Sequence, residues 1–250
     1  MPRSRRLLIL GGTGEARALA DALTDRPGLD VTTSLAGRTT EPRRPRGDVR
    51  IGGFGAAAGM AEYLKTAGID LVIDATHPYA AAISGHAVEA CQLAGRPLLR
   101  VERRAWQPQK GDRWIVVDDL AAAAEVAPEL GHRAFLTIGV KELAAFATVE
   151  EVWFLVRLVD RPDEPVLLRN FELVLARGPF ELSQERALMK RHGIDLVIAK
   201  NSGGKATYAK IAAARELGLP VLLLRRPVLA PAETVASIAE AVGWIEARSA

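Results

Sequence analysis

The chain has 250 residues, of which 49% are hydrophobic and 25% are charged. This composition supports a sizeable core and excludes a disordered chain, and the single cysteine, Cys91, excludes an internal disulfide or a cysteine-rich metal centre. The net charge of +3 is too small to indicate nucleic-acid binding, and no apolar run reaches the roughly 18 residues that span a bilayer. We therefore expect a cytoplasmic protein without metal, nucleic-acid or membrane partners, and a monomer is compatible with these features.

Short apolar runs alternate with alanine-rich segments along the whole chain, which predicts strands and helices in turn. Runs such as 71–73 and 221–224 are unbroken, as is typical of strands that are covered on both faces. The expected strands are 6–10, 30–34, 48–51, 70–74, 97–101, 114–117, 134–138, 152–157, 172–176, 195–199 and 220–224. The expected helices are 15–25, 57–67, 79–94, 119–127, 141–146, 181–192, 205–217 and 231–246. This alternation predicts an α/β fold with parallel sheets.

The segment 103–113 is the best candidate for a domain boundary because it combines proline, glycine, tryptophan and charged residues. It would separate an α/β domain at 1–103 from a second one at 114–250. A single α/β domain of this length is the alternative. No internal repeat is evident in the sequence.

The segment Leu7–Arg17 joins four apolar residues to a glycine-rich turn and then to an alanine-rich helix. The N-terminus of a helix offers free backbone N–H groups and the positive end of a dipole, so such a turn can bind a phosphate. Gly11 and Gly14 permit a close approach that a Cβ would prevent. Their spacing to Ala18 is a relaxed form of the dinucleotide-binding fingerprint, and no Gly-Lys-Ser/Thr follows. A tight strand–helix turn without a ligand is the alternative.

The loop after the second predicted strand indicates which dinucleotide the domain would bind. An NAD-binding domain carries an acidic residue here that binds the ribose hydroxyls. This loop has none before Glu41 and offers Ser34, Arg38 and Thr39 instead. Hydroxyls and a guanidinium suit a 2′-phosphate, so the loop favours NADP over NAD. A solvated arginine on the surface is the alternative.

Two further loops follow predicted strands. Gly52–Gly55 combines three glycines with Phe54, which indicates a second close approach of backbone to a ligand or a plain turn. In Asp74–Ala80, His77 precedes a proline, which disfavours helical geometry. A histidine at the carboxyl end of a strand is a candidate for binding or proton transfer, and a helix cap is the alternative.

The second half of the chain has cationic loops after its strands. Lys141 follows the strand at 134–138, Arg177 follows the strand at 172–176, and Lys200–Lys205 follows the strand at 195–199. The last loop is polar and leads into a helix, so it is a second candidate for anion binding. One anion-binding loop in each domain predicts a ligand site in a cleft between the two.

Taken together, these motifs resemble the family of precorrin-6A and cobalt-precorrin-6A reductases of corrin ring biosynthesis. The resemblance spans roughly residues 7–227, and its most specific blocks are Asp74–Pro78, within the matching segment Asp74–Ala80, and Lys200–Gly204. The other matching segments are Gly11–Arg17, Leu35–Thr39, Gly52–Gly55, Arg100–Trp106, Phe135–Gly139 and Arg177–Phe180. His86 departs from the asparagine expected in many members.

The resemblance implies two Rossmann-like domains with a ligand cleft between them, and the NADPH-dependent reduction of a ring double bond in an anionic tetrapyrrole. On this basis we expect NADPH at Gly11, Gly12, Thr13, Gly14, Glu15, Ser34, Gly37, Arg38, Thr39, Gly53, Phe54 and Thr76. We expect the substrate at His77, Tyr79, Lys141, Arg177, Lys200, Asn201, Ser202, Gly203 and Lys205. His77 and Lys200 are the expected catalytic residues, with His77 as proton donor.

Two alternatives remain open at this point. Because a fold alone does not assign a function, the chain could be a non-catalytic NADP-binding sensor. It could also be a methyltransferase that acts on the same class of substrate, although the missing acidic residue after the second strand weighs against that.

Overall fold

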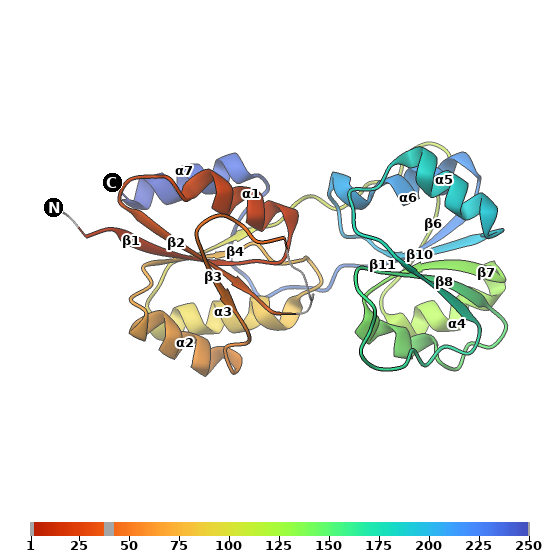
Figure 1. Cartoon of the computed structure of the whole chain (residues 1–250), viewed down its shortest axis with the longest axis horizontal. Helices are drawn as coiled ribbons and strands as arrows, with labels where there is room; N and C mark the ends of the chain where they lie inside the picture. The colour runs from red at the N-terminus through yellow and green to blue at the C-terminus, as the bar shows by residue number, and fades with distance from the viewer. Residues whose placement is uncertain (1–2, 38–42, 250) are drawn as a thin grey trace. The chain divides into compact units, whose positions relative to one another are not determined.

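The computed structural model describes residues 3–37 and 43–249. The chain divides into two units, and each is described by itself (Figure 1). The first unit comprises Met1–Arg104 and Pro227–Ala250, and the second comprises Ala105–Arg226. No helix within the described part of the chain is both long and apolar enough to cross a membrane.

The first unit is a six-stranded parallel sheet with helices on both faces. The order of its strands is β3-β2-β1-β4-β5-β12. Their bounds are β1 Arg5–Leu10, β2 Leu29–Leu35, β3 Asp48–Ile51, β4 Leu71–Asp74, β5 Leu98–Val101 and β12 Glu233–Val235. Helices α1 (Gly14–Leu23) and α7 (Ile238–Ser249) cover one face, and α2 (Ala56–Thr66) and α3 (Ala81–Ala94) cover the other (Figure 1).

The unbroken apolar run of β1 explains its central position. Leu7 and Ile9 pack into the core beneath α1 and α7, whereas Leu8 and Leu10 pack into the core beneath α2 and α3. All four side chains are buried. A strand that is covered on both faces needs apolar residues at every position, which is the pattern that the sequence shows.

The second unit is also a six-stranded parallel sheet, with the strand order β9-β8-β7-β10-β11-β6. Its strands are β6 Arg113–Val117, β7 Arg133–Thr137, β8 Trp153–Leu158, β9 Phe171–Leu175, β10 Leu196–Lys200 and β11 Pro220–Leu224. Its helices are α4 Leu120–Leu130, α5 Leu182–Arg191 and α6 Ala209–Glu216, with the 3₁₀ turns η1 Val140–Phe146 and η2 Lys205–Thr207. The fold class that the sequence predicts, an α/β fold with two parallel sheets, is confirmed.

The two sheets have the same strand order. The edge strand of each, β12 in the first and β6 in the second, comes from the part of the chain next to the other unit's strands. β6 follows β5 in the chain but pairs with β11, whereas β12 follows β11 but pairs with β5. The predicted extent of the second domain, 114–250, is therefore wrong for its C-terminal part. The expected helix 231–246 is wrong at its start, because Glu233–Val235 form a strand there.

Physical contacts explain this return to the first unit. β12 pairs with Leu99–Val101 of β5, and Arg100 donates from Nη1 to the carbonyl oxygen of Ala230 at 2.8 Å. Trp244 and Ile245 of α7 are buried in the core that α1 also covers. Two smaller differences concern helices: 141–146 is a 3₁₀ turn, and the expected helix 205–217 is divided into η2 and α6.

Candidate cofactor and substrate sites

The glycine-rich turn between β1 and α1 is held in place by Thr13. Thr13 is the N-cap of α1, and its hydroxyl accepts a hydrogen bond from the backbone N–H of Ala16 at 3.1 Å. The same hydroxyl donates to the carbonyl oxygen of Ala75 at 2.7 Å. Thr13 therefore caps the helix and ties the turn to the loop that follows the neighbouring strand β4.

The three glycines of this turn have different roles. A Cβ at Gly11 would lie 2.9 Å from Cγ2 of Thr33, so this position needs glycine for close packing. Gly12 has a φ of +106°, which few residues other than glycine adopt. No atom lies within 4 Å of a Cβ built at Gly12 or Gly14, so the space beside the first turn of α1 is open. An open N-terminus with free N–H groups suits a phosphate or pyrophosphate.

Glu15, also expected at the cofactor, lies in the first turn of α1 and pairs with Arg103 at 2.6 Å between Oε2 and Nη1. Its negative charge is thereby partly balanced, which reduces its repulsion of an anion at the same helix end.

A buried ion pair anchors the loop after β4. Arg100 donates from Nε to Oδ2 of Asp74 at 3.2 Å, and both side chains are buried. Oδ1 of Asp74 accepts from the backbone N–H of Thr76 at 3.2 Å and from its hydroxyl at 2.7 Å. The Thr76 hydroxyl also lies 3.3 Å from Oγ of the buried Ser84. Asp74 therefore fixes Thr76 at the carboxyl edge of the sheet, next to the turn after β1.

His77 and Tyr79 lie together in this loop. The backbone N–H of Tyr79 donates to Nδ1 of His77 at 3.3 Å, and the two rings are 5.7 Å apart between centroids. The backbone N–H of Ala80 donates to the carbonyl oxygen of His77 at 2.7 Å. This contact lies before α3, whose N-cap, Ala80, has no side-chain cap, so it is a local turn contact and not the helix cap that the sequence left as an alternative. With Nδ1 as an acceptor, the imidazole can donate only from Nε2.

The remaining cofactor-side predictions concern the loops after β2 and β3. Ser34 is buried near the end of β2, and Gly37 follows that strand with a φ of +71°. Arg38 and Thr39 lie outside the described residues. Gly53 and Phe54 follow β3, where Arg50 contacts both of them. Arg50 was not predicted as a site residue because it lies within β3, whereas the predicted residues lie mainly in loops after strands.

The substrate-side predictions fall on the carboxyl edge of the second sheet. Lys200, at the end of β10, donates from Nζ to Oε1 of Glu142 in η1 at 2.6 Å. Arg177 pairs with Asp160 at 3.4 Å. Lys141 is exposed in η1. These cations come from loops after β7, β9 and β10, so they share one edge of the sheet.

The loop after β10 is fixed by the link that precedes β6. The side-chain oxygen of Asn201 accepts from the backbone N–H of Trp106 at 2.8 Å, and its Nδ2 donates to the Trp106 carbonyl oxygen at 3.2 Å. Nε1 of Trp106 donates to the carbonyl oxygen of Gly204 at 3.1 Å. Ser202 and Gly203 are buried within the loop, whereas Lys205 is exposed. Asn201 therefore serves at least as a structural clamp.

A cavity of about 620 Å³ adjoins this loop. Trp106, Phe180, Leu182 and Tyr208 give it aromatic and apolar walls, and Lys205 supplies a cation at its edge. An apolar cavity with few charged groups is the usual form of a site for an organic ligand. Among the predicted residues, Lys205 is the side chain that lines it.

The second unit also contains a buried charged cluster that was not predicted from the sequence. Arg157 pairs with Glu185 at 2.5 Å, and its guanidinium lies 3.6 Å from the ring centroid of Phe180. Lys210 is buried nearby and donates to the carbonyl oxygen of Thr207 at 3.1 Å. Burial, with a smaller contribution from Arg157, lowers the pKa of Lys210 from its usual 10.5 to about 7.

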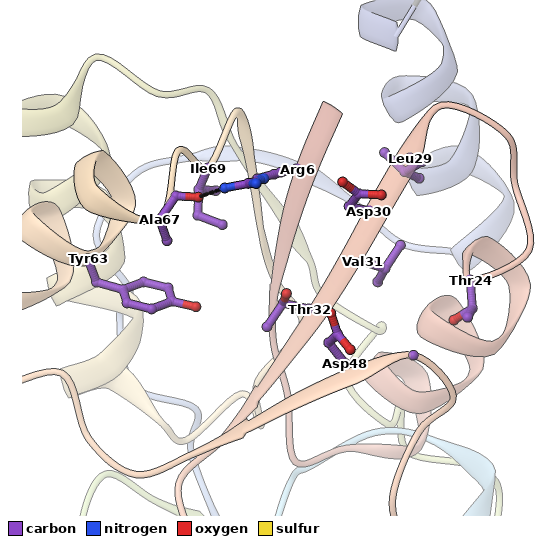
Figure 2. A pocket seen from close by; sticks show the side chains of 11 residues that line it. Arg6, Thr24, Leu29, Asp30, Val31, Thr32, Asp48, Tyr63, Ala67 and Ile69 are labelled. Carbon is purple, nitrogen blue, oxygen red and sulfur yellow. Dashed lines mark hydrogen bonds between the residues drawn. The ribbon is translucent and has the colours of Figure 1, made fainter. Parts of the chain in front are cut away.

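A second cavity of about 450 Å³ lies in the first unit, and Figure 2 shows its lining. Arg6, Leu29 and Asp48 stand at or next to the amino ends of β1, β2 and β3, and Arg6 donates to the carbonyl oxygen of Ala67 (Figure 2). None of the predicted site residues lines it. Ligands of parallel α/β sheets bind at the carboxyl ends of the strands, so this cavity is at the opposite end from the glycine-rich turn.

The strand order of each sheet, read from β1 and β7 outward, is that of the Rossmann fold, and the turn after β1 leaves open space at a helix N-terminus. These features define a Rossmann-type protein with two α/β units.

Comparison with known proteins gives the family. Residues 6–246 match the family model described as precorrin-6x reductase CbiJ/CobK. The chain is 52% identical to the precorrin-6A reductase of Rhodococcus erythropolis over 96% of its own length and 97% of that protein. It is 31% identical to the cobalt-precorrin-6A reductase of Priestia megaterium, with 88% and 90% covered. A solved structure of CobK precorrin-6A reductase superimposes with a TM-score of 0.93 at 43% identity, with 98% of each chain covered. The chain belongs to the precorrin-6x reductase family and is an oxidoreductase, as the resemblance predicted.

Proposed function

We propose that this chain uses NADPH to reduce a carbon–carbon double bond of precorrin-6A or cobalt-precorrin-6A. The observation that carries the proposal is full-length membership of a family whose relatives bear these names, combined with the open glycine-rich turn after β1. The reduction consumes a hydride and a proton, and NADPH supplies the hydride when it is bound.

The residues of the first unit fit the cofactor. A Cβ built at Gly12 or Gly14 would meet open space beside the N-terminus of α1, and we propose that the pyrophosphate binds to the backbone N–H groups there. Thr13 and Asp74 hold this turn and the Thr76 loop beside each other, which suits the ribose and nicotinamide half. The preference for NADPH over NADH rests on the loop after β2, which has no acidic residue in Ser34–Gly37.

The residues of the second unit fit a substrate with several carboxylates. Lys141, Arg177, Lys200 and Lys205 belong to loops at one edge of the sheet, and cations recognise carboxylates by charge-assisted hydrogen bonds. In this proposal Lys200 leaves Glu142 and binds a substrate carboxylate. His77 donates a proton from Nε2 as an imidazolium, in which Nδ1 also carries a proton and no longer accepts from the Tyr79 N–H. The Tyr79 ring helps to orient the imidazole.

The decisive test is the oxidation of NADPH in the presence of each tetrapyrrole. We expect the absorbance of NADPH to fall on addition of precorrin-6A or cobalt-precorrin-6A, with a dihydro product detected by mass spectrometry. Binding of NADPH without oxidation would indicate a sensor. Transfer of a methyl group from S-adenosylmethionine would indicate a methyltransferase. Comparison of the two substrates gives the preference for the metal-free or the cobalt form.

A further inference from the structure

Arg50 of β3 occupies an unusual position at the carboxyl edge of the first sheet. It lies opposite Ser34 in the pairing of β2 with β3, and Nη1 donates to the Ser34 hydroxyl oxygen at 3.1 Å. The same nitrogen donates to the carbonyl oxygen of Gly52 at 2.7 Å, and Nη2 donates to that of Gly53 at 2.5 Å. The guanidinium therefore joins the ends of the two strands.

Aromatic contacts fix the plane of this guanidinium. Its Cζ lies 3.8 Å from the ring centroid of Phe54 and 5.1 Å from that of Tyr63. The two rings pack edge to face at 5.3 Å between centroids. Stacking of this kind holds an arginine in one orientation while leaving its charge intact. Arg50 is thus preorganised at a position where a ligand of this fold places its ribose.

No described carboxylate pairs with the positive charge of Arg50. Its hydrogen-bond partners are a hydroxyl and two carbonyl oxygens, and the described residues provide no acidic group within ion-pair distance. A guanidinium has five N–H groups, and these three bonds leave two without an acceptor in the part of the chain that the structure describes. The Ser34 hydroxyl accepts from Arg50 and so keeps its own proton for donation.

We propose that Arg50, together with the Ser34 hydroxyl, binds the 2′-phosphate of the cofactor and sets the preference for NADPH over NADH; this inference rests on the proposed function. A guanidinium can present paired N–H groups to phosphate oxygens, whereas the bare ribose hydroxyl of NADH offers no charge to it. The absence of an acidic residue at Ser34–Gly37 removes the group that would favour NADH. Arg38 is the competing candidate from the sequence.

The test uses two adenosine nucleotides that differ only in the phosphate in question. Isothermal titration of the full chain with 2′,5′-ADP and with 5′-AMP measures the contribution of the 2′-phosphate without need of the tetrapyrrole. We expect Arg50→Gln to weaken the binding of 2′,5′-ADP about tenfold or more and to leave that of 5′-AMP unchanged. Glutamine can still donate to a loop carbonyl, and Arg50→Lys should restore part of the binding because it restores the charge.

Arg46→Ala is the matched control. Arg46 precedes the same strand, and its exposed guanidinium pairs with Asp25 instead of the strand ends. The Arg46→Ala variant should bind both nucleotides with wild-type affinity. Equal weakening of both nucleotides in Arg50→Gln would overturn the inference and leave Arg50 as a loop support. Loss of the 2′-phosphate preference in Arg38→Ala, with retention in Arg50→Gln, would also overturn it. If the wild type binds neither nucleotide, the proposed function fails as well.

Discussion

The two units have the same strand order, but the turns that follow their central strands, β1 and β7, differ in one decisive respect. After β1 the chain enters α1 directly, and the space beside Gly12 and Gly14 is open. After β7 the chain enters the 3₁₀ turn η1, and a Cβ at Gly139 would collide with the carboxylate of Glu142. The second unit thus places its own anion beside the turn that corresponds to the glycine-rich turn of the first.

This difference shows that the shared fold does not carry a shared site. An anion can approach the first turn of α1, whereas at η1 a protein carboxylate is already present and pairs with Lys200. The N-terminus of a full helix is also a better anion site than a short 3₁₀ turn. We therefore propose that the dinucleotide binds to the first unit and that the cations of the second unit bind the substrate.

The largest expected effect is a loss of stability that is confined to the first unit. Asp74→Ala removes one partner of a buried ion pair and leaves Arg100 charged and unpaired, which should cost about 3–5 kcal/mol of unfolding free energy. Hydrogen exchange followed by mass spectrometry should show the loss in peptides of the first unit, with those of the second unit unchanged.

A matched control for this substitution is Asp118→Ala, which breaks an exposed pair with Arg225 and should cost less than about 1 kcal/mol. If Asp74→Ala lowered the protection of both units equally, the two sheets would unfold as one cooperative body, and the comparison between them would not extend to stability.

The second prediction places a carboxylate beside the glycine-rich turn of the first unit, as Glu142 stands beside Gly139 in the second unit. Gly14→Glu places a carboxylate at the first residue of α1, where the built Cβ meets no atom within 4 Å. The fold should be retained, because an acidic residue stabilises a helix N-terminus. The binding of NADPH should weaken about 100-fold, which corresponds to about 2.8 kcal/mol. Fluorescence titration of NADPH measures the change.

Gly14→Ala is the control for this experiment, because it adds the Cβ without the charge. It should bind NADPH within a few-fold of the wild type. Wild-type affinity in Gly14→Glu would show that the pyrophosphate does not lie at this turn, and the contrast with Gly139 would then lose its functional meaning.

Several features of this comparison could be predicted from the sequence. These strands could be predicted because β1, β4 and β11 each contain a continuous apolar run, and the spacing of Gly11 and Gly14 marks the first turn. The exchange of β6 and β12 could not be predicted. β12 has only three residues, and its partner β5 is more than 100 residues away along the chain, so no local pattern shows which sheet it joins.

The charged residues of the site were harder to predict for a related reason. Arg50 owes its role to Ser34 on a neighbouring strand and to the ring of Phe54, which are contacts between separate elements. Lys210 stands on α6 at a spacing that would equally suit a surface lysine, and its burial near Trp106, Arg157 and Glu185 depends on contacts between separate elements. Sequence periodicity does not contain this information.

The third prediction concerns that buried lysine. The pKa of Lys210 is about 7 in the folded chain and about 10.5 when unfolded, so between these values the unfolded chain binds a proton that the folded chain lacks. Stability should therefore rise with pH across this window, by about 1.4 kcal/mol for each pH unit, and should not change on this account below pH 7.

Lys210→Met removes the titrating group, so the variant is the reference without this pH dependence. The unfolding free energy of the wild type should rise relative to that of the variant as the pH rises from about 7 to about 10. Urea unfolding at several pH values measures it. The charged groups around Lys210 are Arg157 and Glu185. A difference that stays constant with pH would mean that Lys210 remains protonated in the folded chain.

The smallest expected effect tests whether the second unit binds the substrate while the first binds the cofactor. Lys200→Ala should raise the KM for the tetrapyrrole about tenfold, or about 1.4 kcal/mol, and leave the KM for NADPH unchanged. Glu142→Gln is the complementary variant, because it releases Lys200 from its partner in η1 and removes a competing anion. It should lower the KM for the tetrapyrrole or leave it unaltered. Steady-state kinetics with each substrate varied in turn distinguishes the two parameters. Equal increases in both KM values for Lys200→Ala would mean that Lys200 supports the fold or contacts the cofactor, and the carboxyl edge of the second sheet would no longer be the substrate side alone.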